Sequence, residues 1–156
     1  MEPYLESVDA IRLCPDDPKG AEHLLDKGTS YVTNSYLSRT GLEFIWESNP
    51  NGSTTTTTRR REAYRKLTTL KASSKTITFF ESADRNVKNY AATDLWFRLE
   101  RVQSDTVLDA VQRDVQTNRH DGAAHYLYAD GHVDSIDEAQ IADWCRDGVN
   151  FGRPPQ

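Results

Sequence analysis

The 156-residue chain contains only two cysteines, one methionine and no long apolar run. None of its apolar segments approaches the roughly 18 residues that a membrane-spanning helix needs. Its first three residues, Met1-Glu2-Pro3, are not the basic start of a signal peptide. As written, the sequence therefore predicts a soluble domain, and we expect a leading element to be missing before it.

Positive charge is also in short supply, with 19 Lys and Arg against 24 Asp and Glu and a formal net charge of -5. Surfaces that bind nucleic acids are usually basic, because they displace counterions from phosphates. A nucleic-acid partner is therefore not expected. The one basic run, Arg59–Arg61 with Arg65 and Lys66, is interpreted as the solvated face of a helix, and a polyanion site is the alternative.

The two cysteines, Cys14 and Cys145, lie near opposite ends of the chain. Their spacing matches no metal-knuckle or redox motif. They are therefore either two buried thiols or the two ends of one long-range disulfide. Cys145 is not expected to be a nucleophile, because Asp143 and Asp147 lie beside it and oppose the formation of a thiolate.

Signatures of common enzymes are absent as well. The chain has no glycine-rich phosphate-binding loop and no Gly-x-Ser-x-Gly elbow, and nothing places a serine next to a base. We therefore expect no catalysis. Trp46, Trp96 and Trp144 could form a platform that stacks on sugars, but their positions on separate elements favour packing roles.

The length and apolar content suit one domain, 1–156, that buries roughly two thirds of the surface of its unfolded form. A stretch with Asn, Pro and Gly followed by five threonines predicts an exposed, mobile loop over 49–58. Strands are expected over 30–37, 42–46, 75–81, 124–128 and 132–136, and helices over 60–70, 104–115 and 138–146. Because strands and helices are mixed without βαβ alternation, the predicted class is α+β, with a mainly antiparallel sheet and short helices.

The most constrained stretch, 119–133, predicts a β-hairpin. Asp130-Gly131 readily adopts the two positive φ angles of a type I′ turn. With these two residues at the centre of the turn, Tyr128 faces Val133, and both share one face with Tyr126. We expect that face to be buried.

The same stretch carries residue types that bind zinc or activate a water, namely His120, His125, Asp130, His132 and Asp134. One interpretation is a metal site. The other is a structural polar network, which is favoured because an aspartate in a turn normally bonds to its own backbone. An irregular calcium loop is a further alternative, although its candidate ligands do not follow an EF-hand pattern: Asp130, Asp134, Asp137 and Glu138.

Four motifs follow one another along the chain. In the last of them Arg119 precedes His120, nine further residues and then Asp130-Gly131-His132. The other three are a Cys-Pro-x-Asp-Pro turn, a Ser-Tyr-x-x-Asn strand and a strand ending on Glu, here Cys14-Pro15-Asp16-Asp17-Pro18, Ser30-Tyr31-Val32-Thr33-Asn34 and Ser74–Glu81. In this order they cover most of the chain, which resembles the prepilin-like (pseudopilin) family with a C-terminal motif of His, nine residues and Asp-Gly, common in planctomycete-type bacteria. The chain departs from the family at His125, where Asn is frequent, and at Asp121, where Gly is frequent.

The resemblance implies the globular head of a pseudopilin-like protein, without its cleaved and methylated N-terminal hydrophobic helix. It implies a structural or interaction role in a type II secretion or type IV pilus-like assembly, with no enzymatic activity. The implied partners are other pilin-like subunits or secretion components. The full-length protein would be membrane-anchored and extracytoplasmic, in the periplasm or at the cell surface. The alternative function is an extracellular module that binds a glycan or another ligand through the tryptophans and the threonine loop.

Three expectations complete this interpretation. Because an extracytoplasmic compartment is oxidising, we expect a Cys14–Cys145 disulfide. We expect no cofactor and no required metal, with calcium as the alternative, because a chain of this length builds a core without one. We expect His120 to be a structural staple whose ring bonds to backbone groups near Asp130-Gly131 or to Glu81 across the sheet.

Overall fold

The computed structural model describes residues 12–38, 40–61, 63, 64 and 66–155. The strands are β1 (Tyr31–Asn34), β2 (Gly41–Ser48), β3 (Thr54–Arg61), β4 (Ile77–Glu81), β5 (Tyr90–Ala91), β6 (Ala123–Tyr128) and β7 (Val133–Asp137). The α-helices are α1 (Gly20–Lys27), α2 (Ser35–Ser38), α3 (Thr93–Trp96), α4 (Leu99–Gln103), α5 (Val107–Asp114) and α6 (Glu138–Arg146), and the 3-10 helices are η2 (Leu67–Thr69) and η3 (Ser73–Lys75). No helix among these residues is both long and apolar enough to cross a bilayer.

Five strands form one sheet in the order β5-β1-β4-β6-β7. All neighbouring strands are antiparallel except β1 and β5, which confirms the predicted α+β class with a mainly antiparallel sheet. β4 lies at the centre and ends at Glu81, as its β-branched and aromatic composition predicted.

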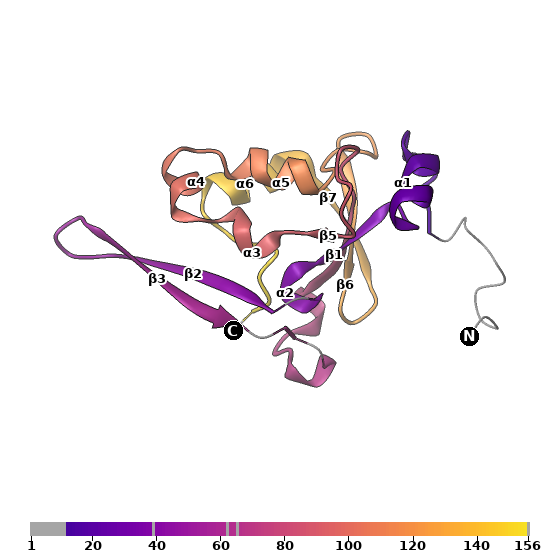
Figure 1. Cartoon of the computed structure of the whole chain (residues 1–156). Helices are drawn as coiled ribbons and strands as arrows, with labels where there is room; N and C mark the ends of the chain where they lie inside the picture. Colours follow the sequence, from indigo (N-terminus) through magenta and orange to yellow (C-terminus); the bar gives the residue numbers. More distant parts are fainter. Residues whose placement is uncertain (1–11, 39, 62, 65, 156) are drawn as a thin grey trace.

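One face of the sheet packs against α3, α5 and α6 (Figure 1). Phe80 of β4 lies in this core, with ring centroids 5.6 Å from Trp96 and 6.0 Å from Tyr126 in edge-to-face geometry. α5, which lies within the predicted helix over 104–115, contributes Val107 and Val111, one helical turn apart on its buried face. Because side chains alternate along a strand, burial of this face leaves the neighbouring residues on the opposite face of the sheet.

Helices were predicted best in the last third of the chain. α6 spans the predicted residues and begins directly after Asp137, which occupies the N-cap position. α5 begins at Val107, later than the predicted start at residue 104, because Asp105 adopts a positive φ of 54°, which is not helical and follows the end of α4. α1 is a full helix of 8 residues that was not among the predicted helices.

The hairpin of β6 and β7 forms, but the predicted type I′ turn is wrong. Tyr128 N donates to His132 O at 2.9 Å, and Gly131 N donates to Tyr128 O at 3.0 Å, which leaves a three-residue loop. Within that loop only Gly131 has a positive φ, of 94°, as in a type I turn followed by a left-handed glycine. Val133 therefore pairs with Leu127 instead of Tyr128. This one-residue shift places Val133 on the face opposite Tyr126, where it is 60% exposed and not buried as predicted.

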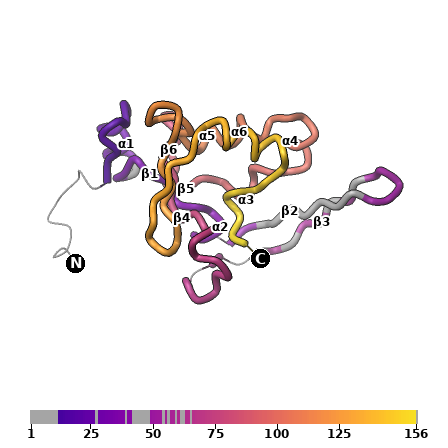
Figure 2. The backbone as a smooth tube through the Cα atoms, turned by 180° about the vertical axis from the view of Figure 1, so that it is seen from behind, coloured from indigo at the N-terminus to yellow at the C-terminus, as the bar shows by residue number. Residues whose placement is uncertain are grey.

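β2 and β3 form a separate two-stranded hairpin that extends away from the rest of the protein (Figures 1 and 2). In this region the predicted loop over 49–58 is confined to residues 49–53, because β3 begins at Thr54. The predicted helix over 60–70 is wrong, because β3 extends to Arg61 and the described residues that follow form the short η2. The threonine tract is β-branched, so it suits an extended strand. The turn between the strands is closed by Asn49 N, which donates to Ser53 O at 2.7 Å.

The C-terminal segment returns to the sheet and is bound there by Asn34, the last residue of β1. Its Nδ2 donates to Ile77 O at 2.8 Å and to Gly152 O at 2.7 Å. Its Oδ1 accepts from Thr93 Oγ1 at 2.7 Å and from Tyr36 N at 3.0 Å. The buried amide thus uses both of its donors and its acceptor, which satisfies the groups that burial would otherwise penalise.

Candidate functional site

Arg119 is the centre of a group of charged side chains at the end of β4. Only 3% of its side chain is exposed. Nη1 lies 2.7 Å from Asp17 Oδ1, and Nη2 lies 2.9 Å from Asp84 Oδ1 and donates to Ser82 O at 2.9 Å. Nε lies 3.4 Å from Glu81 Oε2. The fork of the guanidinium lets one side chain contact three carboxylates from two separate parts of the sequence, Asp17 on one side and Glu81 and Asp84 on the other.

Asp17 is the most enclosed of these carboxylates. Lys19 N donates to its Oδ1 at 2.9 Å, and its Oδ2 lies 2.7 Å from His23 Nδ1 on α1. Burial alone raises the pKa of Asp17, but the polar groups of Ser30, Arg119 and His23 around it lower the pKa by more, so it lies well below its usual range. Asp17 therefore stays ionised in the folded protein.

His120 connects three other members of this group. Its Nε2 lies 2.8 Å from Glu81 Oε1 and 3.5 Å from Cys14 Sγ, and its Nδ1 lies 2.8 Å from Asp16 Oδ2. The contact with Glu81 confirms one of the two predicted partners of His120. The ring of His125 stacks on that of His120, with centroids 4.3 Å apart.

The backbone explains why His120 points toward β4. His120 N donates to Ala123 O at 2.8 Å, and Ala123 N donates to His120 O at 3.0 Å. The tight turn between them uses positive φ angles at Asp121, 51°, and Gly122, 91°. This turn brings His120 back beside the start of β6, whose neighbour in the sheet is β4.

We refer to these side chains as the Arg119 cluster: Cys14, Asp16, Asp17, His23, Glu81, Asp84, Arg119 and His120. It joins the turn before α1, the end of β4 and the segment before β6. With neutral histidines and a neutral thiol, its four carboxylates outnumber its single guanidinium and leave a formal charge of -3. A cluster with this excess of negative charge attracts a metal cation.

The structure divides the motif residues between three places. Cys14, Asp17, Glu81, Arg119 and His120 meet in the cluster, and Ser30 is buried beside Asp17. Tyr31 lies on the open face of the sheet, Asn34 holds the C-terminal segment, and Pro15 and Pro18 are exposed in the turn before α1.

Asp130, Gly131 and His132 stay at the tip of the hairpin. Asp130 Oδ1 lies 2.5 Å from His132 Nδ1, and the His132 ring stacks on Tyr128 with centroids 4.2 Å apart. The hydrogen bond from His132 lowers the pKa of Asp130. The metal site considered as an alternative for His120, Asp130 and His132 is therefore not assembled, because the turn residues bond to each other.

The calcium alternative also lacks a common site. Glu138 Oε1 accepts hydrogen bonds from Thr117 Oγ1 at 2.9 Å and from Gln112 Nε2 at 3.0 Å, and Asn118 Nδ2 donates to Oε2 at 3.2 Å. Within the described ranges, the one group of three metal-ligating side chains with converging atoms is Cys14, Glu81 and His120.

The predicted disulfide between Cys14 and Cys145 is not formed, since both residues are free and buried. Cys14 belongs to the Arg119 cluster, whereas Cys145 lies on α6 in the hydrophobic core. Burial raises the pKa of Cys14, and burial raises the pKa of Cys145 to about 11. Both therefore behave as structural thiols of low reactivity in the absence of a further ligand.

The face of the sheet opposite the core carries an apolar groove of about 430 Å³. Its lining residues are Arg12, Thr29, Tyr31, Phe79, His125, Leu127 and Val133. Phe79 on the central strand is 40% exposed, which is unusual for a large aromatic side chain. Since His125 both lines the groove and stacks on His120, the groove and the Arg119 cluster are adjacent.

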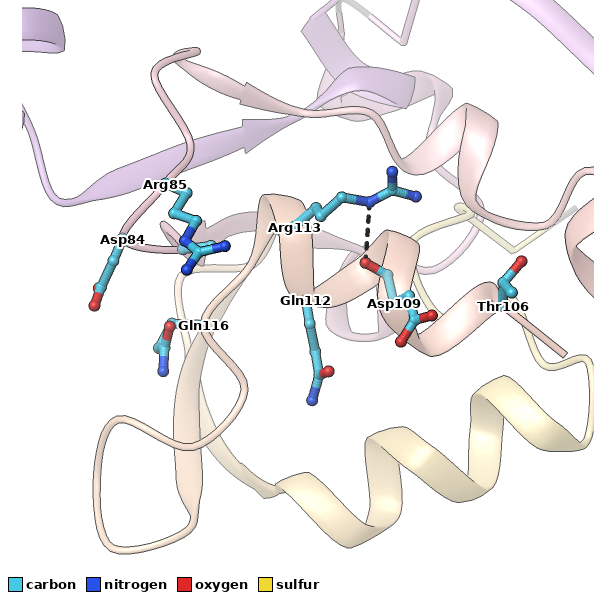
Figure 3. Close-up of a pocket in the computed structure, with 8 residues that line it drawn as sticks. Asp84, Arg85, Thr106, Asp109, Gln112, Arg113 and Gln116 are labelled. Atoms are coloured by element: carbon cyan, nitrogen blue, oxygen red, sulfur yellow. Dashed lines mark hydrogen bonds between the residues drawn. The ribbon is translucent and has the colours of Figure 1, made fainter.

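A larger hollow of about 760 Å³ lies between the loop after β4 and α5 (Figure 3). Its polar side chains spread apart and do not converge on one point, and Asp84 is held by Arg119. Arg113 Nε donates to Asp109 O of its own helix at 3.2 Å. This hollow therefore lacks the converging polar groups expected of a catalytic or ligand-binding site.

The tryptophans do not form the platform considered for glycan binding. Trp96 is fully buried, and its Nε1 donates to Asp114 Oδ2 at 2.9 Å. Trp144 is half-buried and packs on Phe151, with ring centroids 5.5 Å apart. The side chain of Trp46 lies outside the described part of the structure.

Sequence reasoning missed Asp16, His23 and Asp84 as members of the cluster. A signal existed for His23, because an aspartate in the turn and a histidine one helical turn into the next element are close enough to pair. No local signal pointed to Asp84, since its partner Arg119 lies 35 residues away. Comparisons with protein-family models, curated proteins and solved structures found no match.

Proposed function

We propose that this chain is the globular head of a pseudopilin-like protein, with a structural and interaction role in a type II secretion or type IV pilus-like assembly outside the cytoplasmic membrane. The observation that carries the proposal is the meeting of the motif residues in space. Cys14 and His120 are 106 positions apart, yet they contact each other at 3.5 Å beside Glu81. Residues of the motifs that lie far apart in the sequence thus share one structural purpose in the cluster, whereas Tyr31, Asn34 and the tip residues 130–132 lie outside it.

That purpose is the joining of distant segments. Arg119 lies within ion-pair distance of Asp17, Glu81 and Asp84, so its charge is balanced by protein carboxylates. Buried charges paired in this way favour the one arrangement of the chain in which every partner is in place. A head domain that is displayed in an assembly needs such a fixed shape, and it needs no catalytic group.

An interaction role also needs a surface. The open face of the sheet supplies one, because Phe79, Leu127 and Val133 form an apolar strip that the helices of the core do not cover. Exposed apolar strips of this kind are typical of protein contacts. We propose that the strip contacts a neighbouring pilin-like subunit.

The test uses the full-length protein in its own cells. We expect an apolar segment of about 20 residues and a prepilin-type cleavage site to precede this region, with the protein in the membrane fraction. A photo-crosslinking residue in place of Val133 should yield a crosslink to another pilin-like subunit, identified by mass spectrometry. The matched position is Leu25 on α1, which is 87% exposed and outside the strip.

Two results would count against the proposal. One is a mature N-terminus without any apolar segment, together with recovery in the cytosol. The other is a set of crosslinks from Val133 that is no different from the set obtained at Leu25.

A further inference from the structure

We propose that Cys14, Glu81 and His120 form a zinc site. Cys14 Sγ, one oxygen of Glu81 and one ring nitrogen of His120 all lie within 4.8 Å of one another. Thiolate, carboxylate and imidazole are the three ligand types that zinc takes in proteins. The inference does not depend on the proposed function, and either one stands if the other fails.

The distances suit a tetrahedral ion after a small adjustment. Zinc bonds of about 2.0 to 2.3 Å put neighbouring ligand atoms roughly 3.3 to 3.5 Å apart. His120 Nε2 and Cys14 Sγ are 3.5 Å apart, within this range. His120 Nε2 and Glu81 Oε1 are 2.8 Å apart, so they would separate by about half an ångström.

A second observation is independent of these distances. His120 Nδ1 faces Asp16 Oδ2 at 2.8 Å, which leaves Nε2 to face Cys14 and Glu81. Histidines that bind metals usually donate their other ring nitrogen to a carboxylate, and this bond fixes the tautomer and the orientation of the ring. Asp16 therefore occupies the place of the supporting carboxylate in a carboxylate–histidine–zinc arrangement.

Charge favours the same ion. Asp16, Asp17, Glu81 and Asp84 exceed Arg119 in formal charge, and Arg119 contacts the Oε2 atom of Glu81. The other carboxylate oxygen of Glu81, Oε1, is therefore the one that faces His120. Zinc binds cysteine as the thiolate, so binding must displace the Cys14 thiol proton to the solvent, and affinity should rise with pH.

Three protein ligands leave a fourth position for a water molecule. His120 is 19% exposed at its side chain and Asp16 is 60% exposed, which gives zinc a route from the solvent. The rival arrangement is a doubly protonated His120 that donates to both Asp16 and Glu81. The two arrangements differ in that only zinc binding requires the Cys14 thiolate.

The experiment titrates the folded, metal-free protein with Zn²⁺ alone by calorimetry, and with Co²⁺ as an optical probe. We expect one Zn²⁺ per chain, release of protons on binding, and a thiolate-to-cobalt charge-transfer band that Zn²⁺ abolishes. Cys14→Ser and His120→Gln should weaken zinc binding by at least tenfold and remove or reduce the cobalt band. Asp16→Asn should weaken it by about 10- to 100-fold, because Asp16 only orients the ligand.

The matched controls are Cys145→Ser, which removes the second buried thiol, and His132→Gln, which removes a histidine at the hairpin tip. Both should bind zinc like the parent. The proposal is overturned if the folded parent shows no cobalt–thiolate band, a result that needs no variant. It is also overturned if zinc affinity survives in Cys14→Ser or His120→Gln, or is lost in Cys145→Ser.

Discussion

Two buried carboxylates, Asp17 and Glu81, depend on one guanidinium for their compensation. Both side chains are almost fully enclosed, and both face Arg119. Removing one partner from a buried pair costs more than the pair contributes, because the remaining charge is left without a partner in a poorly solvated site. The stability of the protein should therefore be sensitive to Arg119.

We expect Arg119→Ala to lower the free energy of unfolding by about 3 to 5 kcal/mol, measured by urea denaturation. Arg119→Lys should recover only part of this loss, since an ammonium cannot reproduce the fork that reaches Asp17 and Asp84 together. Arg146→Ala is the control, because Arg146 pairs with Asp143 on an exposed helix surface and should matter little. A parent-like midpoint for Arg119→Ala would contradict this account.

Asp17 gives the protein a dependence on acid pH. Its pKa is lower in the folded state than in the unfolded chain, so the folded state binds fewer protons and stability rises with pH. This contribution is fully present above the unfolded pKa of about 3.9 and is lost as the pH falls toward the folded value. Asp17→Asn should lower stability at neutral pH and flatten the decline below about pH 4.

The measurement is thermal or urea unfolding of both proteins at a series of pH values. Asp26→Asn on the exposed surface of α1 is the matched control and should follow the parent curve. If the stability of Asp17→Asn falls with decreasing pH as steeply as that of the parent, other carboxylates produce the acid dependence.

At the scale of elements, the tip of the β6–β7 hairpin depends on Gly131. Its φ of 94° disfavours any residue with a Cβ, although an added Cβ would meet no atom within 4 Å. Gly131→Ala should therefore cost about 1 kcal/mol through the backbone alone. Gly20→Ala provides the comparison, because Gly20 lies in α1 without a positive φ, and its added Cβ would have contacts of 3.8 Å or more.

Gly20→Ala should be neutral or stabilising, since alanine suits a helix better than glycine. Equal losses for the two variants would show that the conformation at Gly131 is not what matters. The stability change of each variant is obtained from the shift of its denaturation midpoint, provided that the slope of unfolding free energy against denaturant is unchanged.

The sequence predicted those elements whose local signals agree with their environment. The aromatic and β-branched run of β4, and the apolar spacing of α6 after Asp137, led to correct elements. The hairpin was predicted but its register was not, because Asp130-Gly131 suits both a two-residue turn and the end of a three-residue turn. The β3 strand was missed, because composition alone suggested a loop for threonines that instead pair across a hairpin.

The Arg119 cluster was only partly predictable for a different reason. The bond between His120 and Glu81 followed from two motifs placed across one sheet. The contacts of Arg119 with Asp17 and Asp84 depend on where the turn before α1 and the loop after β4 come to lie. Such positions are determined by packing over the whole chain, which residue spacing does not encode.

For the whole molecule, Gly152 is the point at which the C-terminal segment meets the core. A Cβ at this position would lie 2.9 Å from Thr93 Cβ and Cγ2 and 3.2 Å from Trp96 Cζ3. Gly152→Ala should therefore cost about 1 to 3 kcal/mol, because the segment must move and weaken the bond from Asn34 to Gly152 O.

Thr93→Ser removes Cγ2 but keeps the hydroxyl that Thr93 donates to Asn34. Combined with Gly152→Ala, Thr93→Ser should restore part of the stability that Gly152→Ala loses. A double-mutant cycle measures this coupling between the two positions. Strictly additive losses would show that the contact with Thr93 is not the cause.

The hydrogen bond from Asn34 to Gly152 O also affects the order in which the chain can fold during synthesis. The two residues are 118 positions apart, so a ribosome adding 5 to 20 residues per second separates their synthesis by roughly 6 to 24 s. During that interval the amide of Asn34 lacks one of its native acceptors. β1 is also made before its sheet neighbour β4, so its edge is unpaired until β4 has been synthesised. The nascent chain thus spends seconds with incomplete strands exposed, and this interval is when chaperones or unwanted strand pairing have access to it.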